Sequence, residues 1–422
     1  MQRLGLPQTG TPPKSAQTSK LARPVHRQKN FLRVLQTRHG ANMPNPLTAA
    51  VIGCGSISQR GVLPHLMCPD AKLRVQVAAV VDVVADRARQ TAEKFGVPAW
   101  FCTMEELFAN TDVDMVLVMT PIQMHFEHAL AAITAGKHVY VQKSMTANLD
   151  QSNKLLAARD KAGIHLVAAP GFELFPTTLR MREIVQSGLI GKIGFGYTYA
   201  WGFGHEFEAV RNGADVLNNI NPLWYYKKGA GPLPDVTIYS LQLATSILGC
   251  VKQVTALGNK LMPERTWRNE TIQIEVEDNV VLLMEFASGA IVTGVGADTA
   301  GSRSNSWGSM GLYGTHGLLE ICDVDGATGY PLKFNVFGGA RGKDVGHRVY
   351  QEALTAQKYL QGDHTNIEEG HLYVDIMELA DSIEEHRTPR ATGEQARHVV
   401  EIIECAHNAI ESGKTQTLTT VF

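Results

Sequence analysis

The chain has 422 residues but no run of about 18 apolar ones, so no membrane-spanning helix is expected. Its six cysteines are scattered without a CxxC pair, which argues against a disulfide framework or a zinc ribbon. This usage favours a reducing compartment, the cytoplasm. GxxxxGK(S/T), HExxH and GxSxG motifs are absent, which removes phosphate-loop NTPases, zincin proteases and elbow-type hydrolases. His125 and His128 have no third ligand nearby in the sequence, so no metal site is predicted.

The first acidic residue of the chain is Asp70, so the residues before it carry no negative side chain. Residues 1–45 are rich in Gln, Thr, Ser, Pro and basic residues, and such a segment cannot bury a core. We expect a disordered or non-native basic extension, with a later start at Met43. An organelle transit peptide and an ordered arm are the alternatives. The net charge of the whole chain is −2, so its remaining body is acidic and nucleic-acid binding is not expected.

Strand and helix patterns alternate between residues 48 and 171. The β-rich runs are 49–52, 73–81, 115–119, 138–142 and 165–169, and helical stretches such as 85–95 and 125–135 separate them. Short apolar runs between helices predict a parallel sheet with both faces covered. The expected first domain is α/β and covers residues 46–170.

After residue 190, strand patterns follow one another. They cover 193–201, 253–257, 271–286, 290–297 and 311–321, and two helices near 370–386 and 393–412 close the chain. Runs of strands predict an α+β second domain, residues 171–422, with a large, mostly antiparallel open sheet. One C-terminal helix could return to the first domain.

The first strand pattern runs into a glycine-rich turn, Gly53-Cys54-Gly55-Ser56-Ile57-Ser58. Gly53 permits a tight turn, and Gly55 lets the backbone approach a pyrophosphate. The helix that starts at Ser56 and Ile57 offers free N–H donors to a phosphate. The third position of this dinucleotide fingerprint holds Ser58 instead of glycine.

The second strand pattern ends in Asp82, where a carboxylate can accept hydrogen bonds from the adenosine ribose. The same charge repels the extra phosphate of NADP, and Val83 and Val84 supply no cation to bind it. Arg87 lies one turn further on. We therefore predict NAD as the cofactor, with NADP less favoured.

Further segments lie in the order of one known family. They are Thr120-Pro121-Ile122-Gln123-Met124-His125, Val141-Gln142-Lys143-Ser144, Pro170 to Pro176, Ser187 to Ile193, Gly231 to Tyr239 and Pro389 to Glu394. Together they resemble the glucose–fructose oxidoreductase / inositol dehydrogenase / MocA (Gfo/Idh/MocA) family over about residues 48–422. The resemblance implies a Rossmann domain and an open-sheet domain. That sheet often forms the oligomer interface in the family, so a homodimer or homotetramer is expected.

The resemblance also implies a reaction, the transfer of a hydride from a secondary alcohol of a sugar, cyclitol or polyol to nicotinamide. Lys143 matches the family's catalytic lysine. The residues expected around the cofactor are Gly53, Gly55, Ser56, Ile57, Asp82, Thr120, Pro121, His125, Gln142 and Lys143. Gln142 replaces a glutamate of the family pattern and Ser144 replaces a proline, which could alter cofactor retention or the chemistry.

Asp235 and Tyr239 are four residues apart, so a helix places them on one face. Many family members have histidine where Tyr239 stands; tyrosine resembles the glucose–fructose oxidoreductase and dihydrodiol dehydrogenase branches. We expect Tyr239 to be the acid/base, its pKa lowered by the Lys143 ammonium. Asp235 would orient the substrate hydroxyls or the lysine.

Aromatic residues crowd the segment 201–228, and their faces can stack on sugar rings. Trp224 and Tyr225 are the expected substrate contacts. Two alternatives remain. A redox-neutral NAD-dependent glycoside hydrolase of the same fold would use the same residues, whereas the presence of Lys143, Asp235 and Tyr239 together argues against a non-catalytic cofactor-binding regulator.

Overall fold

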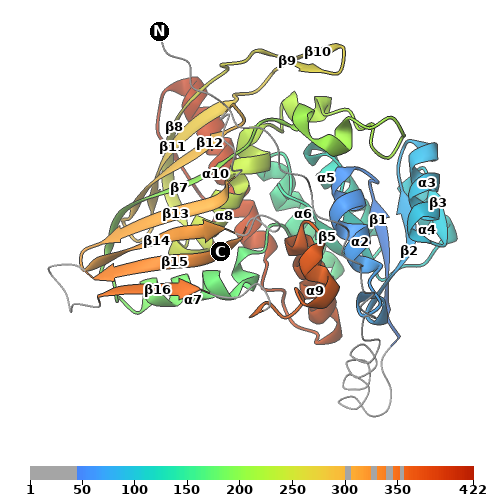
Figure 1. Cartoon of the computed structure of the whole chain (residues 1–422), viewed down its shortest axis with the longest axis horizontal. Coiled ribbons are helices and arrows are strands. Elements are labelled where there is room, and N and C mark those ends of the chain that lie inside the picture. The colour runs from blue at the N-terminus through green and yellow to red at the C-terminus, as the bar shows by residue number, and fades with distance from the viewer. Residues whose placement is uncertain (1–44, 300–305, 325–329, 339–345, 352–355) are drawn as a thin grey trace, which may run out of the picture. The chain divides into compact units, whose positions relative to one another are not determined.

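The computed structural model describes residues 45–299, 306–324, 330–338, 346–351 and 356–422. The extension expected at residues 1–45 therefore lies outside the described residues, except for Asn45. The described chain forms a six-stranded sheet, a nine-stranded sheet and a two-stranded ribbon (Figure 1). Within these ranges, no helix combines the length and apolar character needed to cross a membrane.

The six-stranded sheet is parallel throughout, with strand order β3-β2-β1-β4-β5-β6. Its strands are β1 (Leu47–Ile52), β2 (Val75–Val81), β3 (Ala99–Phe101), β4 (Met115–Val118), β5 (His138–Val141) and β6 (Leu166–Ala168). The linking helices are the π-helical turn η1 (Ser58–Val62), α2 (Leu63–Leu66), α3 (Ala85–Phe95), α4 (Met104–Asn110), α5 (Ile122–Thr134) and α6 (Leu149–Ala162).

Both faces of this sheet are buried. Along β1, Ala49 and Val51 pack into one apolar cluster, while Ala50 and Ile52 pack into another on the opposite face. The chain order reverses at β1, whose neighbours are β2 and β4. In doubly wound sheets the carboxyl ends of the strands at such a reversal border the nucleotide crevice.

The nine-stranded sheet has the order β16-β15-β14-β13-β7-β12-β11-β8-β17 and is antiparallel except for the β7–β12 pair. Its strands are β7 (Ile193–Trp201), β8 (Val251–Asn259), β11 (Asn279–Phe286), β12 (Ile291–Ala297), β13 (Ser306–Gly314), β14 (Gly317–Val324), β15 (Pro331–Gly338), β16 (His347–Gln351) and β17 (Gln416–Thr417). The ribbon is β9 (Glu264–Trp267) with β10 (Glu270–Gln273).

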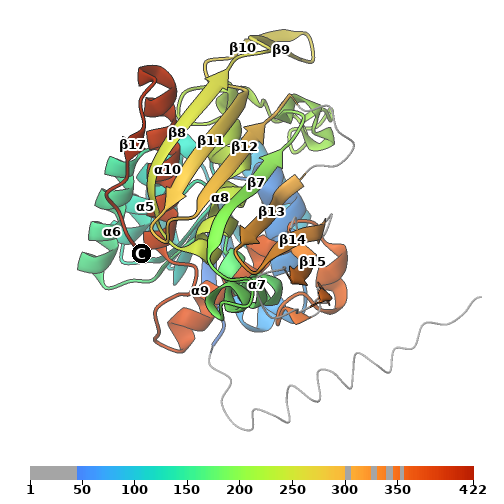
Figure 2. The same cartoon turned by 90° about the vertical axis from the view of Figure 1, so that its left-hand side faces the viewer.

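Helices cover one face of the large sheet. The helix α8 (Ile238–Leu248) contacts β7 and β13, and α7 (Pro176–Gln186) packs against α8. The opposite face is turned to the viewer in Figure 2. Along a strand such as β11, exposed side chains alternate with buried ones. An alternating strand with one wet face is typical of antiparallel sheets.

The last two helices both pack against the first sheet's side of the molecule, and the second of them also reaches the second sheet. Helix α9 (Gly370–Glu384) packs on β5, β6 and η1, and α10 (Gly393–Ser412) contacts both α6 and β8. A backbone bridge between Val167 and Thr392 adds a direct link. The predicted fold class, a parallel Rossmann sheet followed by a large, mostly antiparallel one, is confirmed.

Two strand predictions were wrong. The pattern at 271–286 is split between β10 and β11. In the segment between them, the buried Asp278 carboxylate accepts the backbone N–H groups of Leu261 and Met262 at 2.7 Å, so this residue bonds to a loop before it faces a strand partner. The pattern at 311–321 is split by a turn between β13 and β14. The predicted hairpin at 286–290 joins β11 and β12.

Candidate active site

A cavity of about 650 Å³ opens where the ends of β1, β2, β4 and β5 meet the segment 205–239. It brings most of the predicted site residues together. Those that line it are Gly53, Gly55, Ser56, Ile57, Asp82, Thr120, Pro121, Gln142, Lys143, Trp224, Asp235 and Tyr239. The dinucleotide fingerprint and the expected catalytic residues therefore share one space.

The fingerprint loop leaves room for a ligand against its backbone. Gly53 has φ +95°, and a Cβ there would come within 2.9 Å of the Met119 carbonyl oxygen, so only glycine fits. A Cβ on Gly55 would meet no atom within 4 Å. The Ser58 hydroxyl, at the third position, donates to the Gly53 carbonyl at 2.5 Å and so holds the turn. The residues present fit a pyrophosphate at this loop.

Asp82 is fixed at the end of β2. Its carboxylate accepts the backbone N–H groups of Cys54 and Val84, each at 2.9 Å. The Arg87 guanidinium lies 3.2 Å away and pairs with it. Burial and the Asp82 charge raise the pKa of the Cys54 thiol to about 12, so this thiol stays neutral. The geometry fits a ribose-binding carboxylate.

The cavity lining includes a line of alternating charges. The Lys143 ammonium donates to Asp235 Oδ1 at 2.6 Å and to the Asp235 carbonyl at 2.7 Å. Asp235 Oδ2 lies 3.0 Å from His205 Nε2, and His205 Nδ1 lies 2.5 Å from Glu208. Arg211 closes the line with a bond to Glu208 at 2.6 Å.

The charges in this line maintain one another. Burial by itself would raise the pKa of Asp235, but the Lys143 ammonium and the bond from His205 outweigh it and hold that pKa below its usual range. Burial would lower the pKa of His205, but Glu208 and Asp235 raise it above its usual value. Both ring nitrogens face carboxylate oxygens, so a protonated imidazole can donate to both.

Tyr239 lines the same cavity one helical turn beyond Asp235. Lys143 Nζ lies 5.4 Å from the centre of the Tyr239 ring, and the Tyr239 hydroxyl lies 3.4 Å from His371 Nε2. Burial, with the charges of Glu369 and Asp235, raises the pKa of Tyr239 well above its usual value. The expectation that Lys143 lowers this pKa was wrong, because the ammonium is bonded to Asp235 instead.

Two predicted residues lie outside the cavity lining. His125 is buried, and its ring nitrogens lie 2.7 Å from the Ser144 and Thr120 carbonyl oxygens, so it ties two loops together. Tyr225 is buried and packs edge-on against His205 at 4.2 Å between ring centres, so it supports the site from behind.

The two departures from the family pattern have structural partners. Gln142 Oε1 accepts the Lys143 backbone N–H at 3.0 Å, and its amide nitrogen lies 3.3 Å from the Tyr140 hydroxyl. The Ser144 hydroxyl donates to the Pro234 carbonyl at 2.7 Å, which anchors the loop that carries Lys143 next to Asp235.

Several residues of the site were not predicted from the sequence. They are Arg60, His205, Glu208, Arg211, Glu369 and His371. His205 lies in the aromatic-rich segment that was noted, which is the one signal that could have found it. Glu369 reaches the cavity from the far end of the chain and pairs with Arg60 at 2.6 Å; no local pattern marks it.

Comparison with known proteins agrees with this geometry. Residues 47–169 match the model of an oxidoreductase family with an NAD-binding Rossmann fold, GFO_IDH_MocA, and residues 178–320 match the GFO/IDH/MocA C-terminal domain. The fold and the site thus define an NAD-binding oxidoreductase of the Rossmann type. The chain belongs to the Gfo/Idh/MocA family.

Relatives in this family have named activities. The chain is 25% identical to levoglucosan dehydrogenase of Pseudarthrobacter phenanthrenivorans, over 65% of this chain and 73% of that protein. It is 29% identical to myo-inositol 2-dehydrogenase of Thermotoga maritima, over 57% of this chain and 65% of that protein. A levoglucosan dehydrogenase structure in complex with NADH shares the fold with a TM-score of 0.74, at 18% identity over 89% of this chain and all of that one (100%).

Proposed function

We propose that the protein is an NAD-dependent dehydrogenase that transfers a hydride between nicotinamide and a secondary alcohol of a sugar, cyclitol or related polyol. One observation supports this most directly: the buried Lys143–Asp235 pair, at 2.6 Å, lines the same cavity as the fingerprint loop and Asp82. The sugar and inositol dehydrogenases among its relatives support the substrate class.

The cofactor would be held by residues of the first sheet. Gly53, Gly55, Ser56 and Ile57 would bind the pyrophosphate through their backbone, and Asp82 would bind the ribose and favour NAD over NADP. Thr120, Pro121 and Gln142 would complete the wall. Bound NAD supplies the acceptor for the hydride, and the protein supplies orientation and proton transfer. In this proposal residues 46–170 form the cofactor domain and residues 171–422 the substrate domain.

In this mechanism Lys143 accepts the hydroxyl proton while the hydride leaves the carbinol carbon, so the alcohol becomes a carbonyl. Lys143 first gives up its own proton toward Asp235. His205 and Glu208 continue that hydrogen-bonded route, and the Glu208 side chain is 27% exposed. The proton would pass from Asp235 through the His205 imidazole to Glu208 and from there to solvent, so that Lys143 is left neutral.

Tyr239 has a different task in this mechanism. Because its pKa is raised, its hydroxyl keeps the proton at neutral pH and donates a hydrogen bond to the substrate oxygen. His371, at 3.4 Å, orients the hydroxyl from behind. Trp224 borders the space that remains for the substrate and would stack on a sugar ring.

A homodimer or homotetramer through the nine-stranded sheet is part of the proposal. The face that helices leave uncovered exposes Phe195, Leu257, Val281, Leu283 and Ile291 on four adjacent strands. An exposed apolar surface of this kind is typical of a protein interface. All six cysteines are free, which supports a reducing compartment, the cytoplasm.

The test mixes the protein with NAD and a panel of aldoses, cyclitols and glycosides and follows the absorbance of reduced nicotinamide. A rise with one substrate, lost in Lys143→Met and only reduced in Tyr239→Phe, is expected. Glycoside cleavage without net reduction would instead identify the redox-neutral hydrolase. NAD binding with neither reaction would leave a cofactor-binding regulator.

A further inference from the structure

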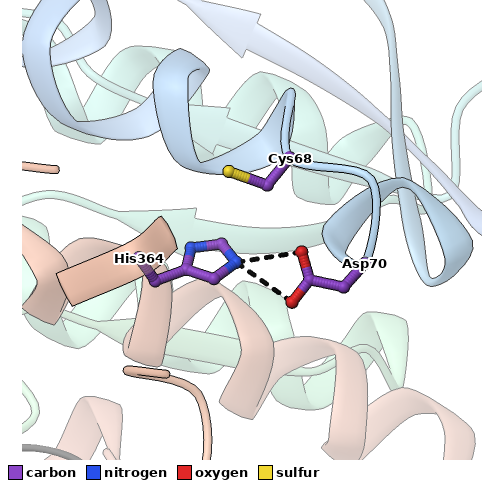
Figure 3. A group of neighbouring side chains, drawn as sticks. All are labelled: Cys68, Asp70 and His364. Carbon is purple, nitrogen blue, oxygen red and sulfur yellow. Dashed lines mark hydrogen bonds and ion pairs between the residues drawn. The ribbon is translucent and has the colours of Figure 1, made fainter. Parts of the chain in front are cut away.

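A second cluster of polar side chains lies away from the cavity, at the end of the helix that follows the fingerprint. Cys68 and Asp70 come just after α2, and His364 comes from η9 (Gly362–Asn366) (Figure 3). One ligand atom from each lies within 4.8 Å of the others. Cys68 and His364 are buried, and none of the three lines the NAD cavity.

The hydrogen bonds around His364 determine where its proton lies. His65 Nε2 lies 3.1 Å from the Glu368 carbonyl oxygen, and an oxygen of this kind can only accept, so His65 carries its proton on Nε2. His65 Nδ1 then accepts from His364 Nδ1, 2.8 Å away. The other ring nitrogen, His364 Nε2, faces the Asp70 carboxylate.

His364 Nε2 lies next to two further groups of the metal-ligand type. Both carboxylate oxygens of Asp70 lie 3.2 Å from His364 Nε2, and the Cys68 side chain approaches the same ring (Figure 3). An imidazole nitrogen, a carboxylate and a thiol therefore share one small space, as the ligands of a bound cation do. Asp363 adds a further negative charge near Cys68, and Lys72 is the neighbouring cation.

We infer that Cys68, Asp70 and His364 bind a divalent transition metal of the zinc type. Thiolate, imidazole and carboxylate are the ligands zinc takes. Two such nitrogen and oxygen ligands around a tetrahedral zinc stand about 3.3 Å apart, close to the 3.2 Å between His364 and Asp70. The thiol would lose its proton on binding, and water would take the fourth position, because the Asp70 side chain is 46% exposed.

His65 has the place of an outer partner in such a site. Metal-binding histidines usually give their other N–H to a second group, which fixes the ring orientation. Here His65 accepts that N–H and is itself anchored on the Glu368 carbonyl. The metal would join η9 to the segment that follows α2, close to the ion pairs of Arg60 with Glu368 and Glu369.

The test uses the full chain, stripped with a chelator and titrated with Co²⁺ and then Zn²⁺. We expect one equivalent of Co²⁺ to give a thiolate-to-metal absorption that Zn²⁺ removes. Zn²⁺ should also slow alkylation of Cys68 by at least tenfold and raise the melting temperature. Cys68→Ser should lose the absorption, and Asp70→Asn and His364→Gln should weaken binding at least tenfold.

The matched control is Cys405→Ser, because Cys405 is a partly buried thiol outside the cluster. It should keep the full cobalt spectrum. No thiolate absorption in the parent protein, or an unchanged one in Cys68→Ser, would overturn the inference. In that case the cluster is an ion pair between a protonated His364 and Asp70. Neither result bears on the dehydrogenase proposal, since the readouts involve no NAD.

Discussion

Losing either side chain of the Lys143–Asp235 ion pair should strongly destabilise the folded protein. The two side chains are 10% and 5% exposed, and their charges lie 2.6 Å apart. At an effective dielectric of 20, this distance gives a Coulomb attraction of about 6 kcal/mol before desolvation is subtracted. Removing one partner of a buried pair costs about 3–5 kcal/mol, because the other charge is left uncompensated.

We predict the cost of each single change from the partners that remain. Asp235→Asn leaves Lys143 without a carboxylate and should lower the free energy of unfolding by about 3 kcal/mol. Lys143→Met leaves Asp235 with His205 at 3.0 Å and should cost about 2 kcal/mol. The double variant should cost about 3 kcal/mol, so the coupling energy is about 2 kcal/mol.

The assay is urea unfolding of the parent, both single variants and the double variant. The control cycle uses Lys154→Met and Asp150→Asn, an exposed i,i+4 pair at the same 2.6 Å whose side chains are 62% and 70% exposed. Solvent screening should hold the coupling of that pair below about 0.5 kcal/mol. If the costs of Lys143→Met and Asp235→Asn are as additive as those of the control variants, the reasoning about a buried pair is refuted.

Three further predictions follow from the same structure. Asp82→Ala should weaken NAD binding about 10- to 100-fold and, by freeing Arg87, raise the affinity for NADP relative to NAD; calorimetric titration with both cofactors checks this, and an unchanged ratio would contradict it. Burial raises the pKa of Glu173 from 4.5 to about 7, so the folded state holds a proton that the unfolded state loses, and stability falls as pH rises through that range. Glu173→Gln should therefore stabilise the protein more at pH 8 than at pH 4, by about 3 kcal/mol of unfolding free energy. Melting temperatures measured at both pH values check this, and equal shifts would contradict it. Leu257→Glu with Val281→Glu, which face each other across β8 and β11, should reduce the mass measured by light scattering to that of the monomer, and an unchanged mass would place the interface elsewhere.

The parts of the site that the sequence predicted depend on local geometry. The fingerprint loop, Asp82 and Lys143 each follow a strand directly, so the chain places them at the edge where the strands end. Asp235 and Tyr239 share one helical turn, so their spacing already placed them together. A motif gives the position of His125 in the chain but not which way its ring points. In the structure, both ring nitrogens lie against backbone carbonyl oxygens.

The missed residues depend on contacts between distant segments. His205 reaches Asp235 across 30 positions, and His371 reaches Tyr239 across 132. The metal cluster joins Cys68 and Asp70 to a histidine almost 300 positions away (294 from Asp70). The raised pKa of Tyr239 likewise comes from burial and from Glu369, neither of which a local pattern records.

The most direct test of the central claim compares Lys143→Met with the parent protein on a substrate found in the panel. We predict that the dissociation constant for NAD changes by less than about threefold, since the fingerprint loop and Asp82 are untouched, while the rate of NADH formation falls at least about 100-fold. Tyr239→Phe should keep measurable turnover. NADH formation at the parental rate in Lys143→Met would contradict the account, because the proton would then leave the alcohol without Lys143.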